Sequence, residues 1–409
     1  MSPVTSAARV VRAGLTARTV RVDAPDLDLL RFAGDHGLLF ERDGVGLAGR
    51  GVAVRCPPHE AAAVLAAIDT DDQVQVPGTG PVAIGALPFE PEAAGTVVVP
   101  RTVVGRAGDG TAWITVVGEG AATELAPEPP LSPGDRPDGF TLRSSRSHRD
   151  WCRVVAQAVD AIRAGGMDKV VLAREVVVEA NRPIQPADVL GRLRALYPSC
   201  TVFSVEGFLG ASPETLVERT GERVRAHPLA GTIPRSGDPA ADARMAAAFL
   251  ASEKERHEHR LVVEQVAERM RSWCTELAVP EVPSIVPLRN VCHLGTELTG
   301  TASASAPSAL GLALHLHPTP AVAGTPTAEA MAWIAAFEGL ERGRYAGPVG
   351  WVDAKGNGRW AVGIRSAEVD GHRARLMAGV GVVADSDPDA ELAETQLKLQ
   401  ALLAAVVRP

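Results

Sequence analysis

The sequence predicts an α+β fold. Strand-like runs occur in clusters, separated by glycine and proline, and the helix-like segments between these clusters are isolated. Such a pattern favours α+β over a regular βαβ series, in which single strands and helices alternate. The 409 residues are compatible with either one large core or two lobes, because typical domains have roughly 100–200 residues.

Residues 1–120 contain short β-like runs, such as 80–89 and 95–100, and one expected helix at Pro58–Ile68. Residues 126–139 are rich in proline, which cannot donate backbone hydrogen bonds, so they indicate a linker or a long surface loop. We therefore expect residues 1–140 to form a mostly β N-terminal part of the same fold that ends in this Pro-rich loop. Residues 141–409 then form the region that holds the candidate functional residues.

Residues 141–409 continue the same pattern of strands and isolated helices. The expected elements are a helix near Arg149–Ala164, a strand at 168–179, a hairpin at 201–219, a long helix from about Pro239 to Cys274, two strands around a turn at 355–358, and a C-terminal helix. Ser386 or Asp387 is the expected N-cap of this last helix, because Pro388 suits its first turn.

The composition excludes several classes of protein. The formal net charge is -8, so nucleic acid is not an expected partner. The five cysteines are scattered without a CxxC pair, as in a cytosolic protein with reduced thiols. No stretch approaches the ~20 apolar residues of a membrane span, and the first residues do not read as a signal peptide. We therefore expect a cytoplasmic protein that binds no membrane.

Two E-x-x-E segments are candidate metal ligands. Glu255 and Glu258 lie three residues apart in the expected long helix, and Glu391 and Glu394 lie three residues apart in the C-terminal helix. Residues at i and i+3 share a helix face, and like charges there repel each other. If these two helix faces lay against each other, they would bring four carboxylates together, which requires a cation. Carboxylate oxygens are ligands that suit Mg²⁺. Solvated helix faces are the alternative interpretation.

Two motifs match known signatures incompletely. HEHRL at 257–261 has Leu261 where the zinc motif H-E-x-x-H requires histidine. GVGVVA at 379–384 resembles a dinucleotide loop, but the acidic SDPD segment that follows would repel a pyrophosphate. Neither zinc protease chemistry nor dinucleotide binding is therefore favoured. Glycines that allow a ligand to approach the backbone remain compatible with the second motif.

Three single residues could carry further chemistry. Lys169 stands at the head of an apolar strand, where burial near a cation could remove its proton and make it a base. Glu214 follows a turn, and Arg365 interrupts an apolar run, where a buried arginine needs an anionic partner. A strand-end charge in water is the plain alternative for Lys169.

Several segments together resemble the chorismate-utilising enzymes, a family that includes isochorismate, salicylate, anthranilate and aminodeoxychorismate synthases. The matching pieces, in family order, are DKVVLAR (168–174), GASPE (210–214), PLAGT (228–232), SEKERHEH (252–259), HLGT (293–296), LHPTPAVAG (316–324), VGWVDAKGNGRWAVGIR (349–365), AGVGVV (378–383) and ETQLK (394–398). GALPFEP (85–91) is similar to the N-terminal part of the family. The ordered set covers residues 150–405.

The resemblance implies a single unit with large, mostly antiparallel sheets packed face to face and with helices outside. It also implies one Mg²⁺ that binds the ring carboxylate of chorismate. Glu258 and Glu394 match direct metal ligands, and Glu255 and Glu391 match carboxylates that reach the metal through water. Residues at positions that resemble substrate contacts are Gly231, Thr232, His293, Ala321, Arg365, Gly379, Gly381 and Lys398.

Within the family, the sequence resembles the isochorismate synthases. Family members that add ammonia carry Gln at the position of Lys169 and a D-L-x-R-N-D-like run where this chain has VVEQVAER, so no glutaminase subunit is expected. Salicylate synthases share the lysine but have Thr near the position of Ala321. The implied protein is a monomeric isomerase in menaquinone or catecholate siderophore biosynthesis. A salicylate synthase and a non-catalytic chorismate-binding paralogue remain the alternatives.

The reaction that the resemblance implies is a double allylic displacement on chorismate. Neutral Lys169 takes a proton from the water that attacks C2, and protonated Glu214 donates a proton to the departing C4 hydroxyl. An acid and a base on opposite faces of a ring are each typically worth ~10²–10⁴ in rate. Mg²⁺ and Arg365 would fix the carboxylates of the substrate.

Overall fold

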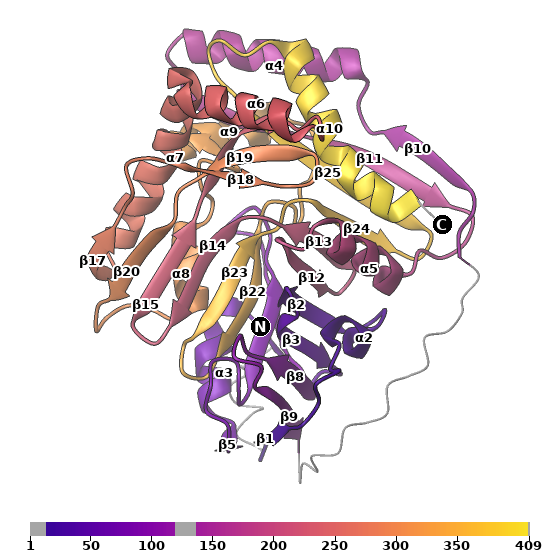
Figure 1. The fold of residues 1–409 in the computed structure, drawn as a ribbon, viewed down its shortest axis with the longest axis vertical. Helices are drawn as coiled ribbons and strands as arrows, with labels where there is room; N and C mark the ends of the chain where they lie inside the picture. Colours follow the sequence, from indigo (N-terminus) through magenta and orange to yellow (C-terminus); the bar gives the residue numbers. More distant parts are fainter. Residues whose placement is uncertain (1–13, 119–135, 408–409) are drawn as a thin grey trace, which may run out of the picture.

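Two large β-sheets and one small sheet form the frame of the protein, and helices surround them (Figure 1). The computed structural model describes residues 14–118 and 136–407. The strands of the largest sheet are β1 (Thr16–Val22), β2 (Leu38–Arg42), β3 (Val45–Arg50), β5 (Asp69–Asp72), β8 (Thr102–Arg106), β9 (Ala112–Gly118), β10 (Phe140–Ser144), β11 (Lys169–Ala180), β12 (Thr201–Val205), β13 (Phe208–Ser212), β21 (Gly324–Thr325), β24 (Ser366–Asp370) and β25 (Arg373–Val382).

The other two sheets contain nine and three strands. The nine-stranded sheet consists of β4 (Val54–Cys56), β6 (Val82–Ala86), β7 (Val97–Val99), β14 (Thr215–Thr220), β15 (Arg223–His227), β17 (Cys274–Ala278), β20 (Leu298–Ala302), β22 (Pro348–Asp353) and β23 (Gly358–Val362). The small sheet consists of β16 (Leu229–Pro234), β18 (Ser284–Pro287) and β19 (Val291–Gly295). Among the described residues, every strand pair is antiparallel except β1 with β5.

The helical elements lie outside the two large sheets (Figure 1). They are α2 (Leu29–Ala33), η1 (Pro58–Glu60), α3 (Ala61–Ala66), α4 (His148–Arg163), α5 (Pro186–Leu196), α6 (Pro239–Ala251), α7 (Glu253–Arg271), α8 (Ala309–Leu316), α9 (Thr327–Phe337) and α10 (Pro388–Val407). Within the two described ranges, no helical segment combines the length and the hydrophobicity of a membrane span.

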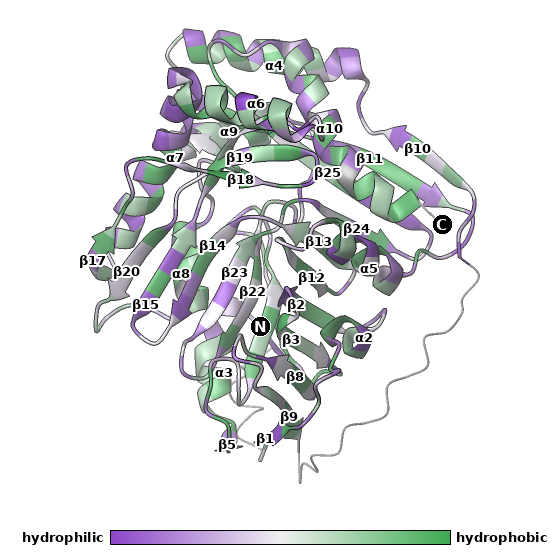
Figure 2. Ribbon diagram, viewed as in Figure 1, coloured by the Kyte–Doolittle hydropathy of each residue, from purple (hydrophilic) through white to green (hydrophobic). Residues whose placement is uncertain are grey.

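The two large sheets pack face to face, as the family resemblance implies. One core cluster joins Phe40 and Trp113 of the largest sheet to Ile84 and Trp351 of the nine-stranded sheet. Helices cover the outer faces with their apolar sides. In α4, for example, hydrophobic residues alternate with hydrophilic ones along the helix (Figure 2), and the side chains that face the core are buried. The predicted α+β fold is therefore confirmed.

Several predicted elements are confirmed, and one is wrong. The hairpin predicted over 201–219 is confirmed for β12 and β13 and turns at Glu206 and Gly207, which both have positive φ, as a two-residue type I′ turn requires. Its last residues belong instead to β14 of the nine-stranded sheet. Asp387 is the cap of α10, because its Oδ1 accepts hydrogen bonds from the first turn. The helix expected over 239–274 is instead two helices. Ser252 has extended backbone between them and caps α7 by accepting a hydrogen bond from the N–H of Glu255.

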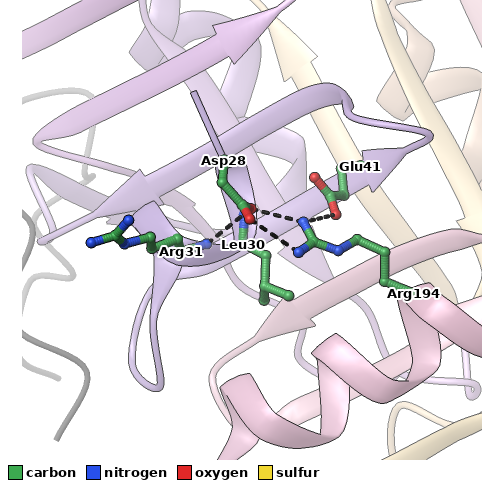
Figure 3. A network of polar contacts seen from close by, with 5 residues as sticks. All are labelled: Asp28, Leu30, Arg31, Glu41 and Arg194. Carbon is green, nitrogen blue, oxygen red and sulfur yellow. Dashed lines mark hydrogen bonds and ion pairs between the residues drawn. The ribbon is translucent and has the colours of Figure 1, made fainter. Parts of the chain in front are cut away.

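The chain segments before residue 119 and after residue 135 contribute strands to the same sheet. In the largest sheet, β2 from the N-terminal part pairs with β12. Beside this pair, Arg194 of α5 donates to both carboxylate oxygens of Asp28 at 2.7 and 3.0 Å and contacts buried Glu41 at 3.4 Å (Figure 3). Of the Pro-rich segment 126–139, only residues 136–139 lie within the described residues.

Candidate active site

One cavity brings the candidate functional residues together. It has a volume of about 230 Å³ and lies where β11, β25, the small sheet, α7 and α10 meet. Every residue to which the sequence analysis gave a role lines it: Lys169, Glu214, Gly231, Thr232, Glu255, Glu258, His293, Ala321, Arg365, Gly379, Gly381, Glu391, Glu394 and Lys398. The sequence therefore predicted a set of residues that are far apart in the chain and close together in space.

The chain passes twice between the two large sheets beside this cavity. Glu214 lies in the first connection, between β13 and β14, and Arg365 lies in the second, between β23 and β24. The two connections are hydrogen-bonded to each other. The N–H of Ala211 donates to the Arg365 carbonyl, and the N–H of Val362 donates to the Glu214 carbonyl, both at 3.1 Å. Backbone hydrogen bonds thus fix the two side chains relative to each other.

Lys169 is the first residue of β11, and its side chain is 4% exposed. Burial lowers the pKa of Lys169, because a charged ammonium loses its water there. The charge of Glu258 opposes this effect, and the charge of Lys398 adds to it. The side chain runs across Gly381, where a Cβ would lie 2.7 Å from its Cε. The lysine is therefore buried and closely packed, and it has a reduced proton affinity.

Glu214 is also 4% exposed, and burial raises its pKa to about 8. A hydrogen bond from the backbone N–H of Leu229 and the charge of Lys169 both oppose this rise. At neutral pH the carboxyl group therefore carries its proton. One cavity thus holds a carboxyl group biased toward its acid form and an amine biased toward its base form.

Arg365 has a positive φ of 52°, a conformation that is uncommon for a residue other than glycine. Its Nη1 donates to the Lys398 carbonyl at 3.2 Å, and its Nη2 lies 3.3 Å from His293 Nε2. Backbone strain of this kind concentrates at functional sites, where the surrounding structure holds it in place. Arg365 is half-buried and lines the cavity wall.

His293 is neutral and orients Arg365. Its Nδ1 lies 2.9 Å from the Gly231 carbonyl and 3.2 Å from the Thr232 hydroxyl. Burial, together with the charge of Arg365, lowers the pKa of His293 to about 3. We assign the ring proton to Nδ1, which donates to Gly231, so that Nε2 accepts a hydrogen bond from Arg365.

The four glutamates line the cavity from α7 and α10. Burial and the charge of Glu258 raise the pKa of Glu255, and burial raises the pKa of Glu391 to about 7, with Glu394 adding to that effect. The charges of Glu258 and Glu394 therefore oppose the ionisation of Glu255 and Glu391. A hard divalent cation fits such an oxygen donor set.

The glutamates do not form a closed ligand cluster in this structure. Among residues 14–118 and 136–407, no three acidic, histidine or cysteine side chains lie close enough together to hold a metal ion. Glu394 is paired with Lys398 instead, at 2.7 Å, and Lys398 also donates to the Gly379 carbonyl at 2.9 Å. The Lys398 contact uses Oε1 of Glu394.

The sequence analysis missed several residues of the cavity wall, including Tyr345, Arg342 and Lys254. Burial raises the pKa of Tyr345 to about 12, so its hydroxyl is neutral. Arg342 and Tyr345 belong to the segment ERGRYAG, directly before a family-like piece that begins at Val349. The charged Arg342, so close to an apolar strand, was the signal that could have drawn attention to this segment.

The chain is similar to proteins of one family. A family model described as chorismate binding enzyme matches residues 58–407. The isochorismate synthase DhbC of Bacillus subtilis is 36% identical over 337 residues, which cover 80% of this chain and 81% of DhbC. The isochorismate synthase EntC of Escherichia coli is 35% identical over 331 residues, or 79% of this chain and 80% of EntC. The solved structure of MenF, the menaquinone-specific isochorismate synthase of Escherichia coli, matches with a TM-score of 0.83 at 25% identity and covers 97% of this chain and 95% of that one.

Proposed function

The chain belongs to the family of chorismate-binding enzymes, and from this membership we propose that it is an isochorismate synthase, an isomerase that converts chorismate to isochorismate. The observation that carries the proposal is the pair Lys169 and Glu214. Both side chains are buried in one cavity, and burial shifts their pKa values toward a neutral amine and a protonated carboxyl group. General base and general acid catalysis require these two protonation states.

In the proposed reaction, neutral Lys169 takes a proton from a water molecule as that water bonds to C2 of chorismate. The ring double bonds shift, and the C4 hydroxyl leaves as water with the proton from Glu214. One water is added and one is lost, so the product is an isomer of the substrate. The burial of both groups supports this assignment, because burial favours the neutral amine and the protonated carboxyl group that the reaction needs.

Arg365 is the proposed ligand of a substrate carboxylate. Its guanidinium is directed by His293 and held by the Lys398 carbonyl. A planar guanidinium can donate two parallel hydrogen bonds to a carboxylate. Lys398 adds a second positive charge to the same cavity.

Mg²⁺ is the proposed cofactor. Glu258 and Glu394 would hold it directly, and Glu255 and Glu391 would hold it through water. When bound, the ion would fix and polarise the ring carboxylate of chorismate. The mutual repulsion of these carboxylates supports the proposal.

Water is the proposed nucleophile, so the enzyme would need no ammonia-supplying subunit. The lysine at position 169 supports this, since a buried base is what a water nucleophile requires. The product could supply either menaquinone or catecholate siderophore synthesis.

Product analysis tests the proposal. Purified protein is incubated with chorismate and Mg²⁺, and the products are separated by chromatography at short times. Isochorismate as the main product is the expected result. Salicylate and pyruvate in equal amounts from the start would make the enzyme a salicylate synthase. Unchanged chorismate would favour a non-catalytic binding protein.

A further inference from the structure

A buried ion pair lies at the wall of the cavity, which Arg342 lines. Glu338 and Arg342 are 2% and 1% exposed. Arg342 Nε lies 2.7 Å from Glu338 Oε1, and Arg342 Nη2 lies 2.6 Å from Oε2. Removing two charges from water is costly, and hydrophobic residues of similar size often stabilise a fold equally well. The pair therefore calls for a role other than stability alone.

The first set of contacts joins the ion pair to β11. Arg342 Nη2 donates to the Val171 carbonyl at 2.7 Å, and Glu338 Oε2 accepts from the N–H of Ala173 at 2.8 Å. Val171 and Ala173 lie two and four residues after Lys169. Both members of the pair thus hold the strand that begins with this lysine.

The second set of contacts joins the ion pair to the segment that contains Ala321. Arg342 Nη1 donates to the Val322 carbonyl at 2.8 Å. The same segment pairs directly with β11, because the N–H of Val171 donates to the Ala323 carbonyl at 2.8 Å. One guanidinium therefore bridges the strand of Lys169 and the segment of Ala321.

The donors of Arg342 are already largely used by these contacts. Four hydrogen bonds, two to Glu338 and two to backbone carbonyls, occupy four of its roughly five N–H groups. The guanidinium also lies over the ring of Phe89, 4.2 Å from its centre. Although Arg342 lines the cavity, its hydrogen bonds are directed into the protein.

We propose that Glu338 and Arg342 are positioning residues that hold β11, and with it Lys169, in register with the Ala321 segment. This inference rests on the proposed function, in which Lys169 is the base. A shift of about 1 Å in a reacting group can cost about 10²-fold in rate. Loss of the pair should therefore reduce kcat more than it changes KM, because Arg365 and Lys398 lie on other elements.

The chain contains a matched control pair two residues away. Arg344 contacts Glu368 through Nε and Nη2 at 2.9 and 2.6 Å, donates to the Val205 carbonyl at 2.8 Å, and lies 5.2 Å from the ring centre of Phe208. Its hydrogen-bonding pattern is similar, although the two side chains are 22% and 28% exposed. Arg344 does not line the cavity, and its hydrogen bonds are to Glu368, Val205 and Glu206.

The experiment compares Arg342→Lys and Glu338→Gln with Arg344→Lys and Glu368→Gln. Lysine keeps the charge but loses the planar fork, and glutamine keeps the shape of glutamate but offers a donor where an acceptor is needed. Thermal unfolding first fixes an assay temperature at which all variants are folded. Steady-state rates of isochorismate formation then give kcat and KM for each variant.

The expected result is a fall in kcat of about 10- to 100-fold for the Glu338 and Arg342 variants, with KM within about threefold of wild type. The control variants should keep kcat within about threefold of wild type. Equal losses of kcat in both pairs would overturn the inference, as would full activity of Arg342→Lys and Glu338→Gln. An inactive wild type would instead overturn the proposed function, and the inference with it.

Discussion

Gly381 leaves the space that the side chain of Lys169 occupies. A Cβ at position 381 would lie 2.7 Å from Lys169 Cε and 3.2 Å from its Nζ. The two residues belong to paired strands, since β11 and β25 are neighbours in the largest sheet. The sequence analysis assigned Gly381 to substrate contact, and the structure adds this packing role.

Gly381→Ala should therefore displace Lys169. The added methyl group would meet the end of the lysine side chain, its Cε and Nζ, so the end that carries the amine must move away. We expect kcat to fall at least about tenfold, because the base loses its position. Gly108→Ala is the control, since a Cβ there has no heavy atom within 4 Å. Comparable rates for the two variants would contradict the packing argument.

Glu214→Gln should abolish most turnover. Glutamine keeps the shape of the side chain but has no transferable proton, and general acid catalysis typically contributes ~10²–10⁴ in rate. Chorismate should still bind, because Arg365 and Lys398 are unchanged. Initial rates measure the first effect, and thermal protection by chorismate measures the second. A variant within a few-fold of the wild-type rate would assign the acid role to another residue.

The rate should depend on pH in a bell-shaped manner. Glu214 must be protonated, so activity is lost as the pH rises through its pKa of about 8. Lys169 must be neutral, so activity is lost as the pH falls through its lowered pKa. Glu255 and Glu258 of α7, and Glu394 and Lys398 of α10, also act on the lysine.

The low-pH and high-pH limbs of the rate profile can be separated by substitution. The residual activity of Lys169→Gln should lack the low-pH limb, and its rate at the wild-type optimum should be much lower. Rate profiles of wild type and variant in constant ionic strength measure both. A profile for Lys169→Gln that superimposes on the wild-type profile would show that Lys169 is not the base.

Metal binding should depend on both helices that carry glutamates. Glu258→Ala and Glu394→Ala should each abolish turnover and weaken Mg²⁺ binding in titration calorimetry, while the proteins remain folded. Glu394→Ala also frees Lys398 from its ion pair. Exposed Glu329→Ala on α9 is a suitable control. Full activity of either variant in excess EDTA would exclude the metal site.

Much of the fold followed from local patterns in the sequence, and the proposed site residues followed mainly from short ordered segments that resemble the chorismate-utilising family. The hairpin at Glu206 and Gly207 and the cap at Asp387 depend only on local backbone chemistry. The break at Ser252 was missed although Ser252 and Glu255 have the spacing of a capping box. No glycine or proline stands at the break, and this absence of a helix-breaking residue concealed it.

Other features depend on contacts between distant residues, which no local pattern encodes. Arg342 contacts Val171, 171 residues away in the chain, and Gly381 is opposite Val171 through strand pairing. The resemblance likewise implied that Glu394 binds a metal, but the sequence gave no sign that Glu394 pairs with Lys398. Such pairings depend on the packed structure.

The paired connections that carry Glu214 and Arg365 limit how this enzyme can diversify. Catalytic groups on surface loops can be exchanged by insertion or deletion, because such loops tolerate changes of length. Here Glu214 and Arg365 lie on two short segments that continue into both sheets. A single added residue in either segment would alter strand register on both sides. New substrates are therefore more accessible through side-chain replacement around the cavity, at positions such as Ala321 and Tyr345, than through remodelling of its backbone.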